Sequence, residues 1–137
     1  MAFTHLHVHS HYSLLDGLSK IPDLVQNAKA KGFTSLALTD HGSMYGTVEF
    51  YNACVAEGLK PILGVETYVA PRRLTDKQAK LDDHPAHLVL LARNLEGYRN
   101  LIQLVTLAHL QGFYYKPRVD HEALERYHGE LWRCLPA

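Results

Sequence analysis

The chain has 137 residues, a length that suits one domain, and 47% of them are hydrophobic, enough for a packed core. Its 14 basic and 14 acidic residues give zero formal net charge, which argues against nucleic-acid binding through bulk positive charge and leaves a local patch open. Its two cysteines, Cys54 and Cys134, lie far apart, so we expect no disulfide framework and a reducing, cytoplasmic setting. No stretch approaches the ~20 apolar residues of a membrane span, so we expect no membrane partner.

Four histidines occupy every second position from residue 5 to residue 11. We predict an extended strand here, because a strand alternates its side chains and points residues two apart to the same face. At ~3.3 Å of rise per residue, His5 and His11 would lie roughly 20 Å apart, so the four cannot share one ion. His7 and His9 are the predicted chelating pair. A strand whose histidines are merely hydrogen-bonded or exposed is the alternative.

The segment that follows is predicted to be an amphipathic helix. Pro22 can occupy its first turn, where the missing N–H is harmless, and Gly32 can end it in a left-handed conformation. The apolar residues between them follow the spacing of one buried helical face. These residues are Ile21, Leu24, Val25 and Ala28.

Strand-like and helical patterns continue to alternate through the rest of the chain. The predicted elements are a strand over 35–39, a helix over 48–57, a strand over 61–69, a polar surface loop over 71–83, a strand over 87–92 and a helix that includes 101–108. This order indicates an α/β fold with parallel strands and crossover helices.

Polar side chains follow these strands where a parallel sheet or barrel gathers its active-site groups, at the carboxyl ends. His7 and His9 end the first strand, and His87, less regularly, opens the fourth. The other candidates are Asp16, Asp40, His41 and Glu66. Taken singly, each has a plainer interpretation, such as a helix cap, a surface carboxylate or a core histidine. As a set, imidazoles with carboxylates suit Zn²⁺, Mn²⁺ or Fe²⁺ better than Mg²⁺ or Ca²⁺.

Several motifs together resemble one protein family. They are LHVHS with YSLLDG over 6–17, LTDHG over 38–42, GVETY over 64–68, HLVLLA over 87–92, GYRNL over 97–101 and GFYYKPR over 112–118. The set resembles the polymerase and histidinol phosphatase (PHP) superfamily. More narrowly, it is similar to the PHP domain that opens the alpha subunit of bacterial DNA polymerase III. The resemblance spans roughly residues 3 to 128.

The resemblance implies a partial distorted (β/α)7 barrel whose complete form holds up to three divalent metal ions, with Zn, Mn or Fe the expected elements. The implied ligands are His7, His9, Asp16, His41, Glu66 and His87. Asp40 and Ser10 are candidates to fix the imidazoles by accepting their hydrogen bonds, and Asp40 is also a candidate direct partner. The residue that performs catalysis is not identified, and His5 and His11 receive no ligand role.

The chain also departs from the family pattern. Complete PHP domains are longer and take further ligands, including a cysteine and a late Asp-x-His pair, from segments without a counterpart here. We therefore expect residues 1–137 to form a single, incomplete PHP domain, the N-terminal portion. Residues 129–137 form an atypical tail, in which the role of Cys134 is open.

Three function classes follow from the resemblance. The first is a fragment of the polymerase III alpha subunit, with metal-dependent phosphoester cleavage or proofreading in the PHP region and DNA, replisome subunits and a proofreading exonuclease as partners. No polymerase carboxylates are identified, so nucleotide addition would belong to other segments. The second is a stand-alone PHP phosphoesterase, and the third is a binding module that keeps metals for stability.

Overall fold

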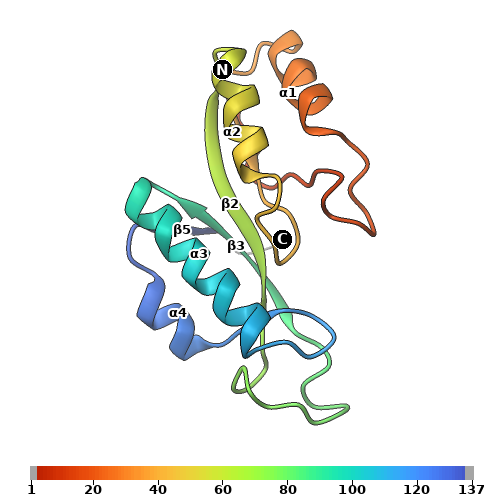
Figure 1. Cartoon of the computed structure of the whole chain (residues 1–137), viewed down its shortest axis with the longest axis vertical. Helices are drawn as coiled ribbons and strands as arrows, with labels where there is room; N and C mark the ends of the chain where they lie inside the picture. Colours follow the sequence, from red (N-terminus) through yellow and green to blue (C-terminus); the bar gives the residue numbers. More distant parts are fainter. Residues whose placement is uncertain (1–2, 135–137) are drawn as a thin grey trace.

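The computed structural model describes residues 3–134 (Figure 1). Its elements are α1 (Ile21–Ala30), β1 (Ser35–Leu38), α2 (Thr47–Ala56), β2 (Lys60–Val69), β3 (Ala86–Ala92), α3 (Leu95–Leu110), β4 (Arg118–Val119), α4 (His121–Tyr127) and β5 (Leu131–Cys134). The predicted mixture of helices and strands is confirmed. The atypical tail contributes β5 to the sheet. None of the described helices is both long and apolar enough to cross a membrane.

The helix ends follow local sequence signals. Pro22 lies in the first turn of α1, and Gly32 follows the helix with a φ of +78°, as the sequence predicts. The N-terminus of α3 is capped by Asn94, whose side chain accepts a hydrogen bond from the amide of Gly97. These signals mark the first turn and the end of α1 and the start of α3.

The sheet is mixed, so the prediction of parallel strands joined by crossover helices is wrong in part. β2 pairs in parallel with β1 and β4, but β3 runs antiparallel to β2, and β5 runs antiparallel to β3. The reason lies in the connection between β2 and β3. A parallel neighbour requires a crossover, usually a helix, whereas residues 70–85 contain no helix and fold back at the end of β2.

The histidine-rich N-terminal segment does not form the predicted strand. It lies along β1 and accepts two backbone hydrogen bonds, from Ala37 N to His5 O (3.0 Å) and from Thr39 N to Val8 O (2.8 Å). The donors are two residues apart and the acceptors three, whereas a regular parallel ladder advances equally on both strands. A bend at His7 accommodates the extra residue, as a bulge does, and interrupts regular pairing.

Helices pack on one face of the sheet. Leu36 of β1 packs with α1 and α2, and Val65 of β2 packs with α3 and α4. These two groups lie at opposite ends of β2 (Figure 1). Strand side chains alternate, so the other face carries a separate small apolar cluster. That cluster consists of Ala37, Val89 and Leu91, with Ile62 and Cys134 packed against it.

The loop over 71–83 is more ordered than a plain surface loop. The Arg118 side chain is fully buried and donates hydrogen bonds to the backbone carbonyls of Leu74, Asp76 and Asp82 at 2.8–3.1 Å. Arg72 also makes two hydrogen bonds to the buried carboxylate of Asp82, at 3.0 and 2.6 Å. The loop is therefore tied to β4 by buried polar groups, which need partners when water is excluded.

We predict that Asp82→Asn destabilises the chain at neutral pH and that this difference shrinks in acid. The Arg72 hydrogen bond lowers the pKa of Asp82 from 3.8 to about 2. The folded-state pKa is the lower one, so the stabilisation is complete above about pH 4 and is lost as the pH falls towards about 2. Urea unfolding at pH 7, 4 and 2.5 measures it, with Glu125→Gln as the control. An equal difference at all three pH values would contradict the assignment.

Candidate metal centre

All six side chains expected as metal ligands meet in one cluster on the sheet face that lacks helices. The cluster consists of three overlapping groups: His7 with His9 and Glu66, His9 with Asp16 and His41, and His41 with Glu66 and His87. Within each group, one nitrogen or oxygen from each residue lies within 4.8 Å of the others. Shared members connect the groups, so the residues form one centre rather than separate sites.

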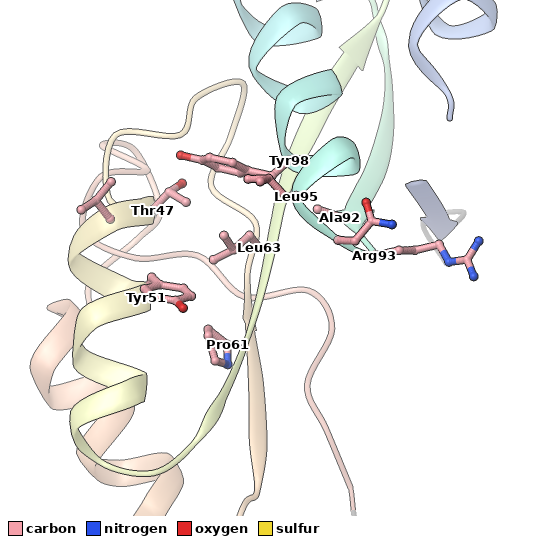
Figure 2. A pocket seen from close by; sticks show the side chains of 10 residues that line it. Thr47, Tyr51, Pro61, Leu63, Ala92, Arg93, Leu95 and Tyr98 are labelled. Atoms are coloured by element: carbon pink, nitrogen blue, oxygen red, sulfur yellow. The ribbon is translucent and has the colours of Figure 1, made fainter. Parts of the chain in front are cut away.

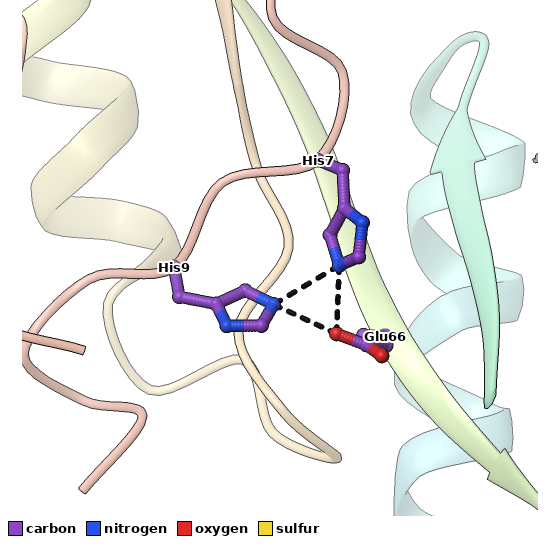
Figure 3. Close-up of side chains that lie close together, drawn as sticks. All are labelled: His7, His9 and Glu66. Atoms are coloured by element: carbon purple, nitrogen blue, oxygen red, sulfur yellow. Dashed lines mark hydrogen bonds and ion pairs between the residues drawn. The ribbon is translucent and has the colours of Figure 1, made fainter. Parts of the chain in front are cut away.

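The first group has the most compact geometry (Figure 3). Nε2 of His7 and Nε2 of His9 each lie 2.7 Å from Oε2 of Glu66, and the two nitrogens are 3.1 Å apart. Two N–H donors on one oxygen would crowd each other at this separation. Ligand atoms about 2.1 Å from a tetrahedral ion lie roughly 3.4 Å apart, so these three atoms stand closer together than around a bound ion and would spread slightly to hold a shared cation.

The second group joins two loops. Nε2 of His41 lies 2.8 Å from Oδ2 of Asp16, and Nδ1 of His9 lies 3.6 Å from the same oxygen. The other ring nitrogen of His41 is buried without a hydrogen bond and lies 3.3 Å from Oε2 of Glu66. A buried ring nitrogen without a partner costs free energy, and coordination to a metal would satisfy it.

The antiparallel β3 explains how the third group forms. His87 opens β3, which would place it far from the carboxyl end of β2 if the strands were parallel. In the observed register Tyr68 pairs with His87, and Val89 pairs with Glu66. Nδ1 of His87 therefore lies 2.5 Å from Oε1 of Glu66. The irregular placement of His87 in the sequence is thus resolved by the strand direction.

Asp40 and Ser10 organise the loop beneath the centre. Asp40 is buried and accepts hydrogen bonds from Ser10 N (2.6 Å), Ser10 Oγ (2.8 Å) and Ser13 Oγ (2.8 Å) rather than from the histidine rings. Ser13 Oγ in turn accepts a hydrogen bond from the amide of His41 at 3.1 Å. Gly17 closes the same loop, because a Cβ there would lie 1.8 Å from Ser10 O. Asp40 thus fixes the backbone that carries His9, Asp16 and His41.

The two acidic candidates are held ionised by the histidines. Burial alone would raise the pKa of Glu66, but hydrogen bonds with His7 and His87 outweigh it and lower that pKa. The hydrogen bond with His41 lowers the pKa of Asp16. Anionic oxygens among imidazoles are the form in which carboxylates bind metal ions.

The two remaining histidines of the N-terminal run and Cys134 lie outside the centre. The His5 ring packs edge-on against Phe3 and Phe33, and His11 lies beside Tyr12. Neither belongs to a candidate metal-binding group among residues 3–134. Cys134 packs against the apolar cluster of Ala37, Val89 and Leu91 instead.

A separate groove of about 480 Å³ lies between α2 and the start of α3 (Figure 2). It is lined by apolar and aromatic side chains such as Tyr51, Leu63 and Tyr98. Leu63 packs with the helix-side core, so the groove opens on the sheet face opposite to the centre. It contributes no ligand atom.

Sequence reasoning missed two residues at the centre. Ser13 had no assigned role, although its spacing of three from Ser10 is that of a tight turn in which both hydroxyls can reach one carboxylate. Tyr68 was also unassigned, although it lies two residues after Glu66 and so on the same strand face. Burial raises the pKa of Tyr68, and the charges of Glu66 and Asp16 raise it further.

Comparison with curated proteins identifies alpha subunits of DNA polymerase III as relatives of this chain. The chain is 51% identical to DNA polymerase III subunit alpha of Treponema pallidum over 136 residues and 45% identical to that of Aquifex aeolicus over 143 residues. These matches cover 98% and 97% of this chain but 12% of each relative. The chain therefore spans only a small part of the length of these relatives.

Solved structures support the fold. An amidohydrolase from Chromobacterium violaceum, solved with bound sulfate and no metal, is 26% identical, with a TM-score of 0.56 over 78% of this chain and 33% of that one. A candidate metal-dependent phosphoesterase from Bifidobacterium adolescentis is 20% identical and shares the fold, with a TM-score of 0.55 over 77% of this chain and 32% of that one.

The family model for the PHP domain matches residues 5–136, nearly the whole chain. The motif resemblance to the PHP superfamily and to the polymerase III alpha subunit is thereby confirmed. The chain belongs to the PHP domain family.

Proposed function

We propose that this chain carries a PHP-type metal centre for phosphoester hydrolysis. The observation that supports it most directly is the convergence of four imidazoles and two carboxylates from separate segments on one open sheet face. His7 and Asp16 are about half exposed, with side-chain exposures of 46% and 53%, while Glu66 is only 4% exposed. The centre is thus anchored on a buried carboxylate and open to solvent where a substrate would approach.

The donor set defines which metals fit. His7, His9, Asp16, His41, Glu66 and His87 would hold divalent ions, with Zn²⁺, Mn²⁺ or Fe²⁺ favoured by the imidazole share of the ligands. When bound, such ions lower the pKa of a coordinated water and neutralise charge on phosphoryl oxygens.

The reaction class is hydrolysis of a phosphoester. Water adds to phosphorus and the ester P–O bond breaks, so that the leaving oxygen departs as an alcohol after taking up a proton. The chain's own residues orient the site: Asp40 fixes the loop of His9 and Asp16 through Ser10 and Ser13. Glu66 fixes the rings of His7 and His87 from the sheet.

The biological setting follows from the relatives. We infer that the chain is the N-terminal portion of a PHP domain in a DNA polymerase III alpha subunit, folded as part of a distorted (β/α)7 barrel. DNA, replisome subunits and a proofreading exonuclease are the proposed partners, in the cytoplasm. Templated nucleotide addition would reside in parts of the relatives that this chain does not match.

A second candidate function is a metal-stabilised scaffold. The Glu66 carboxylate contacts His7 from the N-terminal segment and His87 from β3. His41, from a third segment, lies 3.3 Å from the same carboxylate. Ions bound at this point would tie these segments together whether or not hydrolysis occurs. The phosphoesterase proposal is favoured by the solvent exposure of His7 and Asp16.

We predict that His7→Ala/His9→Ala removes metal binding from the purified chain. Both rings share the same Glu66 oxygen, so the double variant leaves that group with one ligand. Metal content by inductively coupled plasma mass spectrometry and Mn²⁺ titration should show stoichiometric binding in the wild type and a loss of at least tenfold in affinity in the variant. His84→Ala/His121→Ala, which removes two histidines outside the cluster, is the matched control. Equal loss in both variants would contradict the assignment, and loss of metal without loss of phosphodiesterase activity would exclude the proposed hydrolysis.

We predict that Asp40→Asn weakens both the fold and the metal centre. The asparagine amide would present an N–H₂ to a site where three donors now meet a carboxylate. The expected cost is about 1–3 kcal/mol of unfolding free energy, with metal affinity reduced about tenfold or more because the loop of His9 and Asp16 loses its anchor. Chemical denaturation and Mn²⁺ titration measure the two effects. Asp23→Asn, at an exposed position of α1, should change neither by a comparable amount. Unaltered metal affinity in a destabilised Asp40→Asn chain would remove the positioning role.

A further inference from the structure

Tyr68 lies inside the metal centre, although it is not among the expected ligands. It follows Glu66 by two residues on β2 and pairs with His87 in the strand register, so all three share one face. Its ring meets the His87 ring edge-on, with centroids 5.0 Å apart, and is nearly parallel to the His41 ring at 5.9 Å. The phenol is thus bounded by two candidate ligands from different segments.

The Tyr68 hydroxyl has no partner in the described chain. Only 6% of the residue is exposed, and no hydrogen bond to its hydroxyl is formed within residues 3–134. Among the described residues, the buried polar atoms without a partner belong to His11, His41 and Asp83, so the Tyr68 hydroxyl lies where solvent reaches it. Tyr68 shares its strand face with Glu66, the carboxylate that joins the first and third groups. A buried ring whose hydroxyl reaches solvent beside this cluster is accessible to a ligand.

The ring is held rigidly. A Cβ at Gly42 would lie 3.1 Å from Cε2 of Tyr68 and 2.7 Å from Cγ of Pro117, so the backbone after His41 packs directly against the phenol. Gly42 also has a φ of +58°, which favours glycine there. Because its surroundings restrict the ring, the hydroxyl is preorganised, and little side-chain entropy would be lost when it binds a ligand.

A positive charge lies beside the phenol. Nζ of Lys116 is 5.4 Å from the centroid of the Tyr68 ring. Lys116 is half-buried and forms no ion pair within residues 3–134. A neutral donor at the candidate metal centre, with an unpaired cation against its ring, suits an anionic ligand with several acceptor oxygens, such as a phosphoryl group.

We propose that Tyr68 is a substrate-contacting residue that donates a hydrogen bond from its hydroxyl to a non-bridging oxygen of the phosphoester. Lys116 adds positive charge against the Tyr68 ring. The inference rests on the proposed phosphoesterase function and deepens it, because it assigns recognition of the phosphoryl group to a residue outside the ligand set. Tyr68 is a donor at neutral pH, since an ordinary tyrosine ionises only near pH 10.

The test is Tyr68→Phe in the full chain, which removes the hydroxyl and keeps the ring. Inorganic phosphate binding to the Mn²⁺-loaded chain is measured by isothermal titration calorimetry, alongside Mn²⁺ affinity and the thermal unfolding midpoint. We expect phosphate affinity to fall about tenfold or more, as for a lost hydrogen bond to a charged group, with Mn²⁺ affinity and midpoint unchanged. With bis-p-nitrophenyl phosphate as substrate, kcat/KM should fall in parallel. Tyr51→Phe, on α2 and outside the centre, is the matched control.

Other outcomes overturn the inference in distinguishable ways. Equal phosphate affinity in Tyr68→Phe and Tyr51→Phe would remove the substrate contact and leave the proposed function intact. A fall in Mn²⁺ affinity or midpoint that accounts for the phosphate effect would make Tyr68 a structural residue. A wild-type chain that binds Mn²⁺ but neither binds phosphate nor cleaves the ester would refute the proposed function, and the inference with it.

Discussion

The carboxylate of Glu66 is the point on which the centre depends. It is nearly fully buried on β2, and its two oxygens lie 2.5–2.7 Å from nitrogens of His7, His9 and His87. Burial of an anion is costly unless it is paired and hydrogen-bonded, so this carboxylate requires the histidines around it. The bent N-terminal segment and the start of β3 bring those histidines to it. A shared cation would relieve the crowding of nitrogen donors around one oxygen by moving the ligand atoms apart.

The sequence was a good guide to which residues gather and a poorer guide to how the backbone brings them together. Motif resemblance selected all six side chains of the cluster, and the signals at Pro22 and Gly32 marked the ends of α1 correctly. Alternation of the N-terminal histidines predicted that His7 and His9 share a face. Such inferences succeed because they depend on neighbouring residues and on the chemistry of the side chains.

The errors concern partners that are distant in sequence. Pairing of the N-terminal segment with β1 is interrupted by one extra residue at His7, which a count of alternating residues does not reveal. The direction of β3 depends on the fold of the loop over 71–83. Arg118, more than thirty residues beyond that loop, ties it down by binding its carbonyl oxygens. A buried arginine so far along the chain leaves no periodic signal, so the sequence predicts a polar surface loop and parallel strands where the structure has an anchored loop and an antiparallel β3.

Crystallography of the Mn²⁺-loaded chain, with anomalous scattering at the manganese edge, tests whether Glu66, His7 and His9 bind one ion. We predict an anomalous peak at the distance of direct coordination from a Glu66 oxygen and from Nε2 of both His7 and His9. The side chains of Glu66, His7 and His9 would then be held by the ion rather than by hydrogen bonds to one another. Retention of the Glu66–histidine hydrogen bonds, with manganese elsewhere or absent, would show that these residues form a hydrogen-bonded network and not a metal centre.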